Sequence, residues 1–170
     1  DNGEIRLGSK VHIGYYDQEH QVLHMDKTLF DELQDTYPDM NNTQIRNVLA
    51  AFLFTGDDVF KRIRDLSGGE RGRVSLAKLM LSEANFLILD EPTRGIDVGA
   101  KQEIYLLMNQ LAESGIGIIM ISSEMDELIG MSDRIIVLHE GKISGELQKG
   151  EFDQETILKY GSGYAVEEQK

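Results

Sequence analysis

The fold of this chain is most tightly constrained by two short apolar runs that flank a helical pattern. Residues 86–89 and 116–121 are almost continuously apolar, as strands buried inside a parallel sheet are. Between them, apolar residues recur at helical spacing over residues 98–112, with Asp97 as a capping residue and Gly115 as a stop. A strand, a helix and a strand in this order predict an α/β fold whose parallel sheet is covered by helices on both faces.

Shorter signals predict elements on both sides of this unit. Residues 5–7 and 11–16 are β-branched and aromatic runs that predict two strands. Residues 28–64 show helical spacing that breaks near Pro38 and Gly56, which predicts a small helical insert. After residue 121, the pattern predicts a short helix over residues 124–129 and a strand over residues 134–138. A turn over residues 139–142 then leads to a partner strand over residues 143–147.

Composition excludes several classes of function. The 170 residues carry 17 Lys and Arg against 30 Asp and Glu, a net charge of −13, which argues against direct contact with nucleic acid. No Cys is present, so disulfides, cysteine zinc sites and thiol catalysis are excluded and a reducing cytoplasm is expected. No apolar run approaches the ~20 residues that span a bilayer, and the chain opens without Met, so we expect a soluble piece of a longer protein.

The positive charge that is present gathers around one short motif. Residues 61–80 carry a net charge of +4, from six basic and two acidic residues. Within them, Ser67 and Glu70 have the spacing of a capping box, which predicts a helix that begins at about Ser67. Two glycines behind Ser67 expose backbone N–H groups near the positive end of the helix dipole, which favours a phosphate site. An ordinary helix cap is the alternative that this spacing alone favours.

Two adjacent carboxylates follow the first apolar run. Asp90 and Glu91 stand where a buried strand would end, and acids there are costly unless a cation or a reacting water uses them. Asp90 is placed to hold Mg²⁺ through water, and Glu91 to orient or deprotonate an attacking water. Gln18 ends the predicted strand before the insert, where it can contact a phosphate or Mg²⁺. Solvated side chains at strand ends are the alternative for all three residues.

Taken together and in this order, these motifs resemble the nucleotide-binding domain of ABC-type ATPases. Gln18 is followed by LSGGE at residues 66–70, FLILDEPT at residues 86–93 and a Gly-Ile-Asp triplet at residues 95–97. The resemblance implies that these segments are, in turn, the Q-loop, the signature, the Walker B strand and the D-loop. It covers nearly the whole chain.

The resemblance also implies cofactors and site residues. ATP and Mg²⁺ are the cofactors, Glu91 is the catalytic glutamate, and Gln18 and Asp90 bind the metal. Ser123 stands at the switch position, where most members of the family carry His and the second domain of sugar importers carries the same Ser. The residues implied in cofactor binding are Gln18, Ser67, Gly68, Gly69, Asp90, Asp97 and Ser123.

Two branches of the family share this resemblance. Residues 1 to about 90, with IGYYDQEH and the run into LSGGE, resemble the ABC-F proteins, which are soluble tandem ATPases that act on ribosomes. From about residue 93, TRGIDVGAKQEIYLLMNQLA and IIMISSEMDE resemble the second ATPase domain of bacterial ribose and galactose importers. The shared LDEPT is where two such halves could be joined, so the resemblance leads us to expect a hybrid chain.

The family's phosphate-binding loop, GxxxxGK[ST] or Walker A, occurs nowhere in the 170 residues. The expected fold is therefore a partial P-loop NTPase-like parallel sheet of ABC ATPase type with a small helical subdomain. One partial domain is expected over residues 1–161. Within it, residues 1–18 would form the strands and the Q-loop, and residues 19–65 the helical insert. Residues 66–161 would form the signature helix, the Walker B strand, the D-loop and the C-terminal βαβ part, and residues 162–170 a tail.

The resemblance implies that ATP is sandwiched head to tail between this chain and a second ABC ATPase domain. The chain would then be a subunit or fragment that couples ATP hydrolysis to transport or to ribosome-associated action. A membrane permease or the ribosome would be the further partner, with the chain in the cytoplasm or at the inner face of the membrane. Because Walker A is absent, we expect the chain alone to be inactive. A non-catalytic interaction module that keeps the ATPase scaffold is the alternative.

Overall fold

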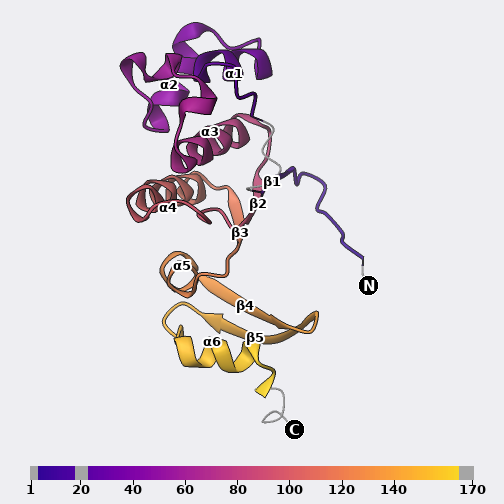
Figure 1. The fold of residues 1–170 in the computed structure, drawn as a ribbon. Coiled ribbons are helices and arrows are strands. Elements are labelled where there is room, and N and C mark those ends of the chain that lie inside the picture. Colours follow the sequence, from indigo (N-terminus) through magenta and orange to yellow (C-terminus); the bar gives the residue numbers. More distant parts are fainter. Residues whose placement is uncertain (1–3, 18–22, 165–170) are drawn as a thin grey trace. The chain divides into compact units, whose positions relative to one another are not determined.

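The structure is a computed structural model that describes residues 4–17 and 23–164 (Figure 1). The chain divides into two compact units, Asp1–Ile121 and Ser122–Lys170. Gln18, the predicted Q-loop residue, lies outside the described residues. No helix among the described residues is both long enough and apolar enough to cross a membrane.

The first unit contains the predicted parallel sheet. Its strands are β1 (Ile13–Asp17), β2 (Phe86–Asp90) and β3 (Gly117–Ile121), in the order β1-β2-β3. In the register of the sheet, Asp90 lies between Asp17 and Ile121, so all three strands end at the same edge. The helices α3 (Gly68–Leu81) and α4 (Val98–Glu113) follow β1 and β2 in the chain and lie side by side (Figure 1).

Helix α3 packs on one face of this sheet. Tyr16 and Leu89 point to that face and are buried, and a Cβ on Gly72 of α3 would lie 3.2 Å from the Tyr16 hydroxyl oxygen. On the other face, Tyr15 is 53% exposed and Ile119 is 48% exposed. The prediction that helices cover both faces is therefore wrong for the described part of this unit. A continuous apolar run shows that a strand can be buried, but it does not specify what covers each face.

The predicted helical insert is confirmed. It consists of α1 (Leu29–Thr36), α2 (Asn42–Ala51) and the short 3₁₀ helices η1 (Gly56–Phe60) and η2 (Ile63–Asp65). Thr28 caps α1, and Asn41 caps α2 with a full capping box. The insert has its own apolar core, formed by Leu29, Leu33, Ile45, Leu49, Phe52, Phe54, Val59 and Ile63.

The first predicted strand is not present. Residues 5–7 form no strand, and the Ile5 side chain is 89% exposed. A short β-branched run becomes a strand only when another strand pairs with it, and none of the described segments does so. Regular structure begins at β1, just after His12, whose backbone N–H donates to the Asn85 side chain at 3.0 Å.

The second unit is a hairpin with two helices. It contains α5 (Met125–Met131), β4 (Arg134–His139), β5 (Lys142–Gln148) and α6 (Gln154–Gly161). The hairpin prediction is confirmed, but among the described strands β4 pairs with β5 alone, antiparallel, and is not part of the parallel sheet. A short strand followed by a tight turn satisfies its hydrogen bonds locally, and the sequence pattern does not reveal this choice.

Helix α6 was not predicted from the sequence. Its local signal is Asp153, whose side chain accepts from the Thr156 amide and caps the helix. Ile157 of α6 packs with Ile135 and Leu147 of the hairpin in a small apolar core. The helix also places the Tyr160 ring directly over Gly145 of β5.

We expect Gly145→Ala to destabilise the chain because the new methyl group would overlap the Tyr160 ring. Overpacking of this kind costs about 1–3 kcal/mol of unfolding free energy. Gly130→Ala, on α5 and with no atom near its Cβ position, is the matched control and should be neutral or slightly stabilising. Urea unfolding followed by circular dichroism measures both variants. Equal unfolding midpoints for the two would contradict the prediction.

Candidate functional site

The two predicted carboxylates lie at the carboxyl edge of the sheet. Asp90 is the last residue of β2, and the Tyr15 hydroxyl of β1 donates to its Oδ2 at 3.0 Å. The register pairs Tyr15 with Ile88, so the ring reaches along the same sheet face to the carboxylate. Sequence reasoning missed this partner because the contact depends on the pairing of strands far apart in the chain.

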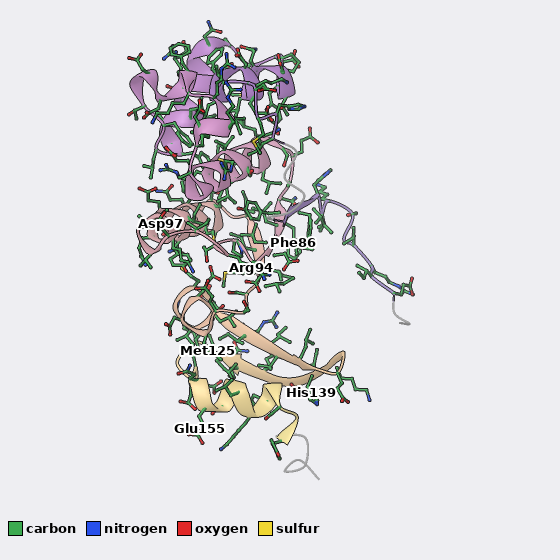
Figure 2. The ribbon with its side chains drawn as sticks, viewed as in Figure 1. Phe86, Arg94, Asp97, Met125, His139 and Glu155 are labelled. Carbon is green, nitrogen blue, oxygen red and sulfur yellow. The ribbon has the colours of Figure 1, made fainter. Side chains whose placement is uncertain are left out.

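Glu91 begins a tight turn and has strained backbone geometry. Its φ is +48°, a left-handed value that costs a residue other than glycine about 1–3 kcal/mol. Its backbone N–H donates to the Ile121 carbonyl at 2.8 Å, which ties the turn to the end of β3. Its carbonyl accepts from Arg94 N–H at 3.2 Å. These bonds fix the turn that leads to Asp97, and Figure 2 shows Arg94 and Asp97 on this segment.

The predicted start of the signature helix is confirmed. Ser67 is the N-cap of α3, and its Oγ accepts from Glu70 N–H at 3.2 Å. In return, a Glu70 carboxylate oxygen accepts from Ser67 N–H at 2.8 Å, which completes the capping box. The amides of Gly68 and Gly69 bond to none of the described residues. They are the donors that a helix N-terminus can offer to an anion.

The Glu70 carboxylate is held in its charged form. Partial burial opposes the charge, but the hydrogen bonds from Ser67 and the positive charges of Lys61 and Arg73 outweigh it, so the pKa of Glu70 is lowered. The charged capping box is therefore favoured at neutral pH, and its contribution to stability is lost as pH falls through the lowered pKa.

The start of α3 lies against the start of α4. A Cβ on Gly69 would lie 2.6 Å from Ala100 Cβ, so only glycine allows this approach. A Cβ on Gly68 would lie 3.7 Å from the Gly95 carbonyl oxygen. Asp97 caps α4, because its Oδ1 accepts from Ala100 N–H at 3.0 Å. The signature and the predicted D-loop are thus neighbours, and the Asp97 side chain already serves a structural role.

Arg73 joins the signature helix to its surroundings. Its Nη1 pairs with Glu103 of α4 at 2.7 Å, and its guanidinium lies 4.7 Å from the centroid of the Phe54 ring in the insert. Its side chain is only 10% exposed. Sequence reasoning treated this arginine only as part of the positive charge around the motif. A basic residue within the apolar pattern of the helix is the signal that could have found it.

Ser123 lies in the second unit, before α5. Its neighbour Ser122 donates to the buried Glu127 carboxylate and accepts from Glu124 N–H at 3.0 Å. The predicted site residues of the first unit form two groups. One group, at the starts of α3 and α4, contains Ser67, Gly68, Gly69 and Asp97. The other, at the end of β2, contains Asp90 and Glu91.

Comparison with known proteins shows the family. The family model described as "ABC transporter" matches residues 2–94, more than half of the chain. The chain therefore belongs to the ABC transporter family. Strand β2 and the start of α3, the predicted Walker B strand and signature, both fall inside the matched range.

Two kinds of curated relatives match. The xylose import ATP-binding protein XylG of Thermoanaerobacter pseudethanolicus is 57% identical over 103 residues, which cover 61% of this chain and 20% of that protein. The ribose import ATP-binding protein RbsA of Bacillus subtilis is 58% identical over 100 residues, with 59% and 20% covered. The putative ATP-binding protein YdiF of Bacillus subtilis is 42% identical over 159 residues, with 94% and 24% covered. The chain spans about a fifth of the length of the first two relatives and about a quarter of YdiF.

A solved structure shares the fold. It is the ATP-binding cassette MJ0796, solved as a dimer in a post-hydrolysis state bound to ADP and Pi. The TM-score is 0.65 at 21% sequence identity, and the match covers 82% of this chain and 64% of that one. The predicted fold class, an α/β fold of ABC ATPase type, is confirmed.

We expect Ser67→Ala to lower the unfolding free energy by about 1 kcal/mol at neutral pH, because the N-cap bond is lost. The Ser67 side chain also helps to lower the pKa of Glu70, so the difference from the wild type should shrink as pH falls through that lowered pKa and the Glu70 carboxylate becomes protonated. Glu70→Gln keeps a capping box that cannot titrate and serves as the comparison. Urea unfolding at several pH values measures all three. A difference independent of pH would contradict the prediction.

Proposed function

We propose that this chain supplies the signature side of a composite ATP site. A second ABC ATPase domain would present ATP on its own Walker A loop, and the N-terminus of α3 would bind the γ-phosphate. The observation that carries the proposal is the pair of amides on Gly68 and Gly69, which lie at the positive end of a 14-residue helix and have no partner among the described residues. Amides and a helix dipole that converge in this way favour a phosphate.

The local charges support the same assignment. The Ser67 hydroxyl is engaged in the capping box, so the two glycine amides provide most of the contact with the phosphate. Arg62 adds positive charge just before the signature and has no ion pair among the described residues. The tight packing of Gly69 on Ala100 holds the amides in place before a ligand arrives. Donors that are already oriented need no reorganisation when charge develops in the reaction.

The carboxylates would serve a nucleotide on the chain's own side. Members of the family bind ATP with Mg²⁺, and carboxylate oxygens are ligands that Mg²⁺ prefers. Asp90, together with Gln18, would hold this ion, and the ion would neutralise the charge of the phosphates. Glu91 would orient or deprotonate a water. Tyr15 supports the assignment because it holds one oxygen of Asp90 and so orients the carboxylate.

A hybrid origin is part of the proposal. Residues 1 to about 90 would derive from an ABC-F protein, and residues from about 93 would derive from a sugar importer. The two patterns of matching support it, because relatives that import sugars match about 60% of the chain at 57% and 58% identity, whereas YdiF matches 94% of it at 42% identity.

The partners follow from the same relatives. A second ABC ATPase domain is supported by the dimeric state of the structural neighbour. A membrane permease is supported by the import function in the names of XylG and RbsA, and would place the chain at the inner face of the membrane. The ribosome, which the ABC-F resemblance implies, stays a prediction. The partial domain over residues 1–161 and the role of Ser123 also stay predictions.

A non-catalytic interaction module is the alternative function. It is favoured by one observation, the lack of GxxxxGK[ST] in the 170 residues, because a nucleotide on this chain alone would lose the loop that cradles its phosphates. The two functions differ in whether the chain can support turnover by another domain.

We expect the isolated chain to show no hydrolysis of Mg-ATP above background. Without the phosphate cradle, we expect ATP to bind with a Kd of about 1 mM or weaker, which is roughly −4 kcal/mol. A coupled phosphate-release assay and isothermal titration calorimetry measure the two quantities. Steady turnover that Glu91→Gln abolishes would show that the chain is a complete enzyme and would contradict this expectation.

The central test uses a full-length ABC ATPase domain whose own signature Ser is replaced by Arg. Its turnover should then depend on a signature supplied by this chain. We expect the wild-type chain to restore turnover, and Ser67→Arg to restore ~10²–10³-fold less, because bulk and charge displace the phosphate from the amides. Glu91→Gln should behave like the wild type, since this carboxylate serves the other nucleotide position.

Analytical ultracentrifugation provides the control that the complex forms with each variant. If the complex forms but the wild-type chain restores no turnover, the signature proposal is wrong and the interaction module is favoured. If Ser67→Arg restores as much as the wild type, the phosphate does not meet this helix.

A further inference from the structure

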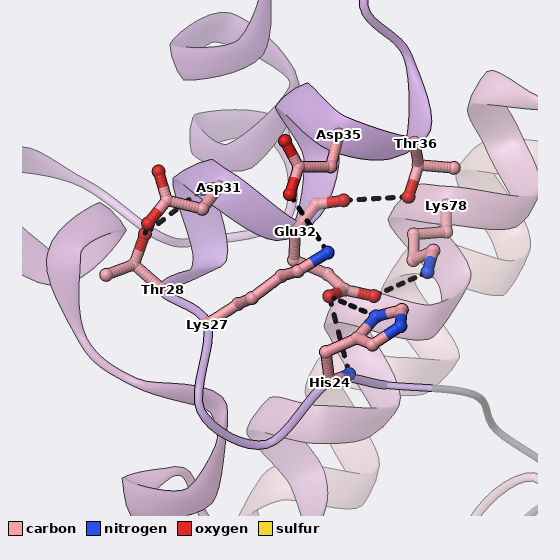
Figure 3. Close-up of polar contacts among 8 residues, drawn as sticks. All are labelled: His24, Lys27, Thr28, Asp31, Glu32, Asp35, Thr36 and Lys78. Carbon is pink, nitrogen blue, oxygen red and sulfur yellow. Dashed lines mark hydrogen bonds and ion pairs between the residues drawn. The ribbon is translucent and has the colours of Figure 1, made fainter.

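One buried carboxylate connects three segments of the first unit. Glu32 of α1 has no exposed surface, and Figure 3 shows its polar contacts. Its Oε1 accepts from Lys78 Nζ at 2.6 Å. Its Oε2 lies 3.0 Å from His24 Nδ1 and accepts from the His24 backbone N–H at 3.4 Å. A buried charge is stable only when it is paired and hydrogen-bonded, and here the partners come from two other segments.

The first partner lies on the signature helix. Lys78 belongs to α3, which begins at Ser67. A second contact joins α1 to the same residue, because the hydroxyl of Tyr37, at the end of α1, donates to the Lys78 carbonyl at 2.7 Å. Lys78 and the two glycine amides belong to the same helix, and secondary elements of this kind can carry a displacement along their length, so we expect a shift at Lys78 to reach the N-terminus.

The second partner lies beside the segment that enters the signature. The stretch that starts at His24 is hydrogen-bonded to the residues just before Ser67. Ile63 N–H donates to the Lys27 carbonyl at 3.0 Å, and Arg64 N–H donates to the Met25 carbonyl at 3.0 Å. Glu32 therefore contacts both the signature helix and the stretch that aligns its leading segment.

A charged group is not needed to fill this place in the core. Replacing a buried ion pair by apolar side chains of similar size is often neutral or stabilising, so stability alone does not explain Glu32. A carboxylate differs from an apolar side chain because its two oxygens form directional hydrogen bonds, which fix the orientation of the groups that donate to them. The pair Lys27–Asp35, at 2.9 Å, provides a contrast, since it lies on the surface and joins residues of the insert only (Figure 3).

We propose that Glu32 is a positioning residue for the signature. By binding Lys78 and His24 at once, it fixes α3 against the insert and so sets where the amides of Gly68 and Gly69 meet a phosphate. The proposal rests on the function proposed above for the signature helix. Its structural part, the link from Glu32 to the two amides, concerns this chain alone.

The first experiment titrates each variant of the chain into the signature-disabled ATPase domain described above. Glu32→Gln removes the charge, and the double variant Glu32→Met with Lys78→Met removes both charges at similar volume. We expect either change to lower the turnover at saturating chain at least about tenfold, because small misplacements of a binding group cost that much or more. The chain concentration at half-maximal turnover should stay the same.

The split between these two quantities separates positioning from stability. A variant that is only less stable contains less folded chain, so it needs a higher total concentration to reach the same maximal turnover. Asp35→Asn, on the same helix and in the surface pair, is the matched control and should change neither quantity. If Glu32→Gln and the double variant reach the wild-type maximum, Glu32 is not a positioning residue.

The second experiment needs no partner. Amide signals of Gly68 and Gly69 in ¹⁵N-labelled chain should shift in Glu32→Gln and in the double variant, but not in Asp35→Asn. Changes confined to the insert and to Lys78 would overturn the link. If the amides shift but the wild-type chain restores no turnover, the proposed function is wrong and the structural link stands. If turnover is restored but the amides do not shift, the proposed function stands and the link is wrong.

Discussion

The close approach of α3 to α4 is the contact on which the rest of the first unit depends. It is possible only because Gly69 has no side chain where Ala100 comes nearest. On the same helix, Gly72 leaves room for the Tyr16 hydroxyl of β1. Arg73 then fills the remaining space with a guanidinium that pairs with Glu103 and lies near the Phe54 ring. Because interiors pack as tightly as organic crystals, these contacts leave the helix start little freedom to move. The site is thus oriented by packing.

The turn after β2 stores strain that the surrounding hydrogen bonds must hold. Glu91 keeps its left-handed geometry because its N–H is bound to the end of β3 and its carbonyl to Arg94. Strain of this kind persists only where the neighbours over-determine it, and it gathers at sites that do chemistry. The same turn leads directly to the Asp97 cap, so the position of Glu91 and the start of α4 are set together.

Local signals predicted more of this structure than long-range ones. The caps Ser67 and Asp97 lie within three residues of their partners, so the starts of α3 and α4 could be predicted from spacing. The bond from Tyr15 to Asp90 and the burial of Glu32 could not, because each joins segments that only the folded chain brings together. Two predictions were wrong for the same reason: that helices cover both faces of the sheet, and that β4 continues the parallel sheet. An apolar run indicates that a strand is buried, but it does not show which element buries it.

The start of α3 and the Asp90–Glu91 pair differ in charge, which supports the proposal that they serve different nucleotides. The start of α3 offers N–H donors and a positive dipole end, which attract a phosphate without any cation. Asp90 and Glu91 repel a phosphate unless Mg²⁺ lies between. A single phosphate bound by both groups would be attracted by the N–H donors and repelled by the carboxylates. Placing the donors on one nucleotide and the carboxylates on another lets each act in full, and a head-to-tail pair of domains is an arrangement that does so.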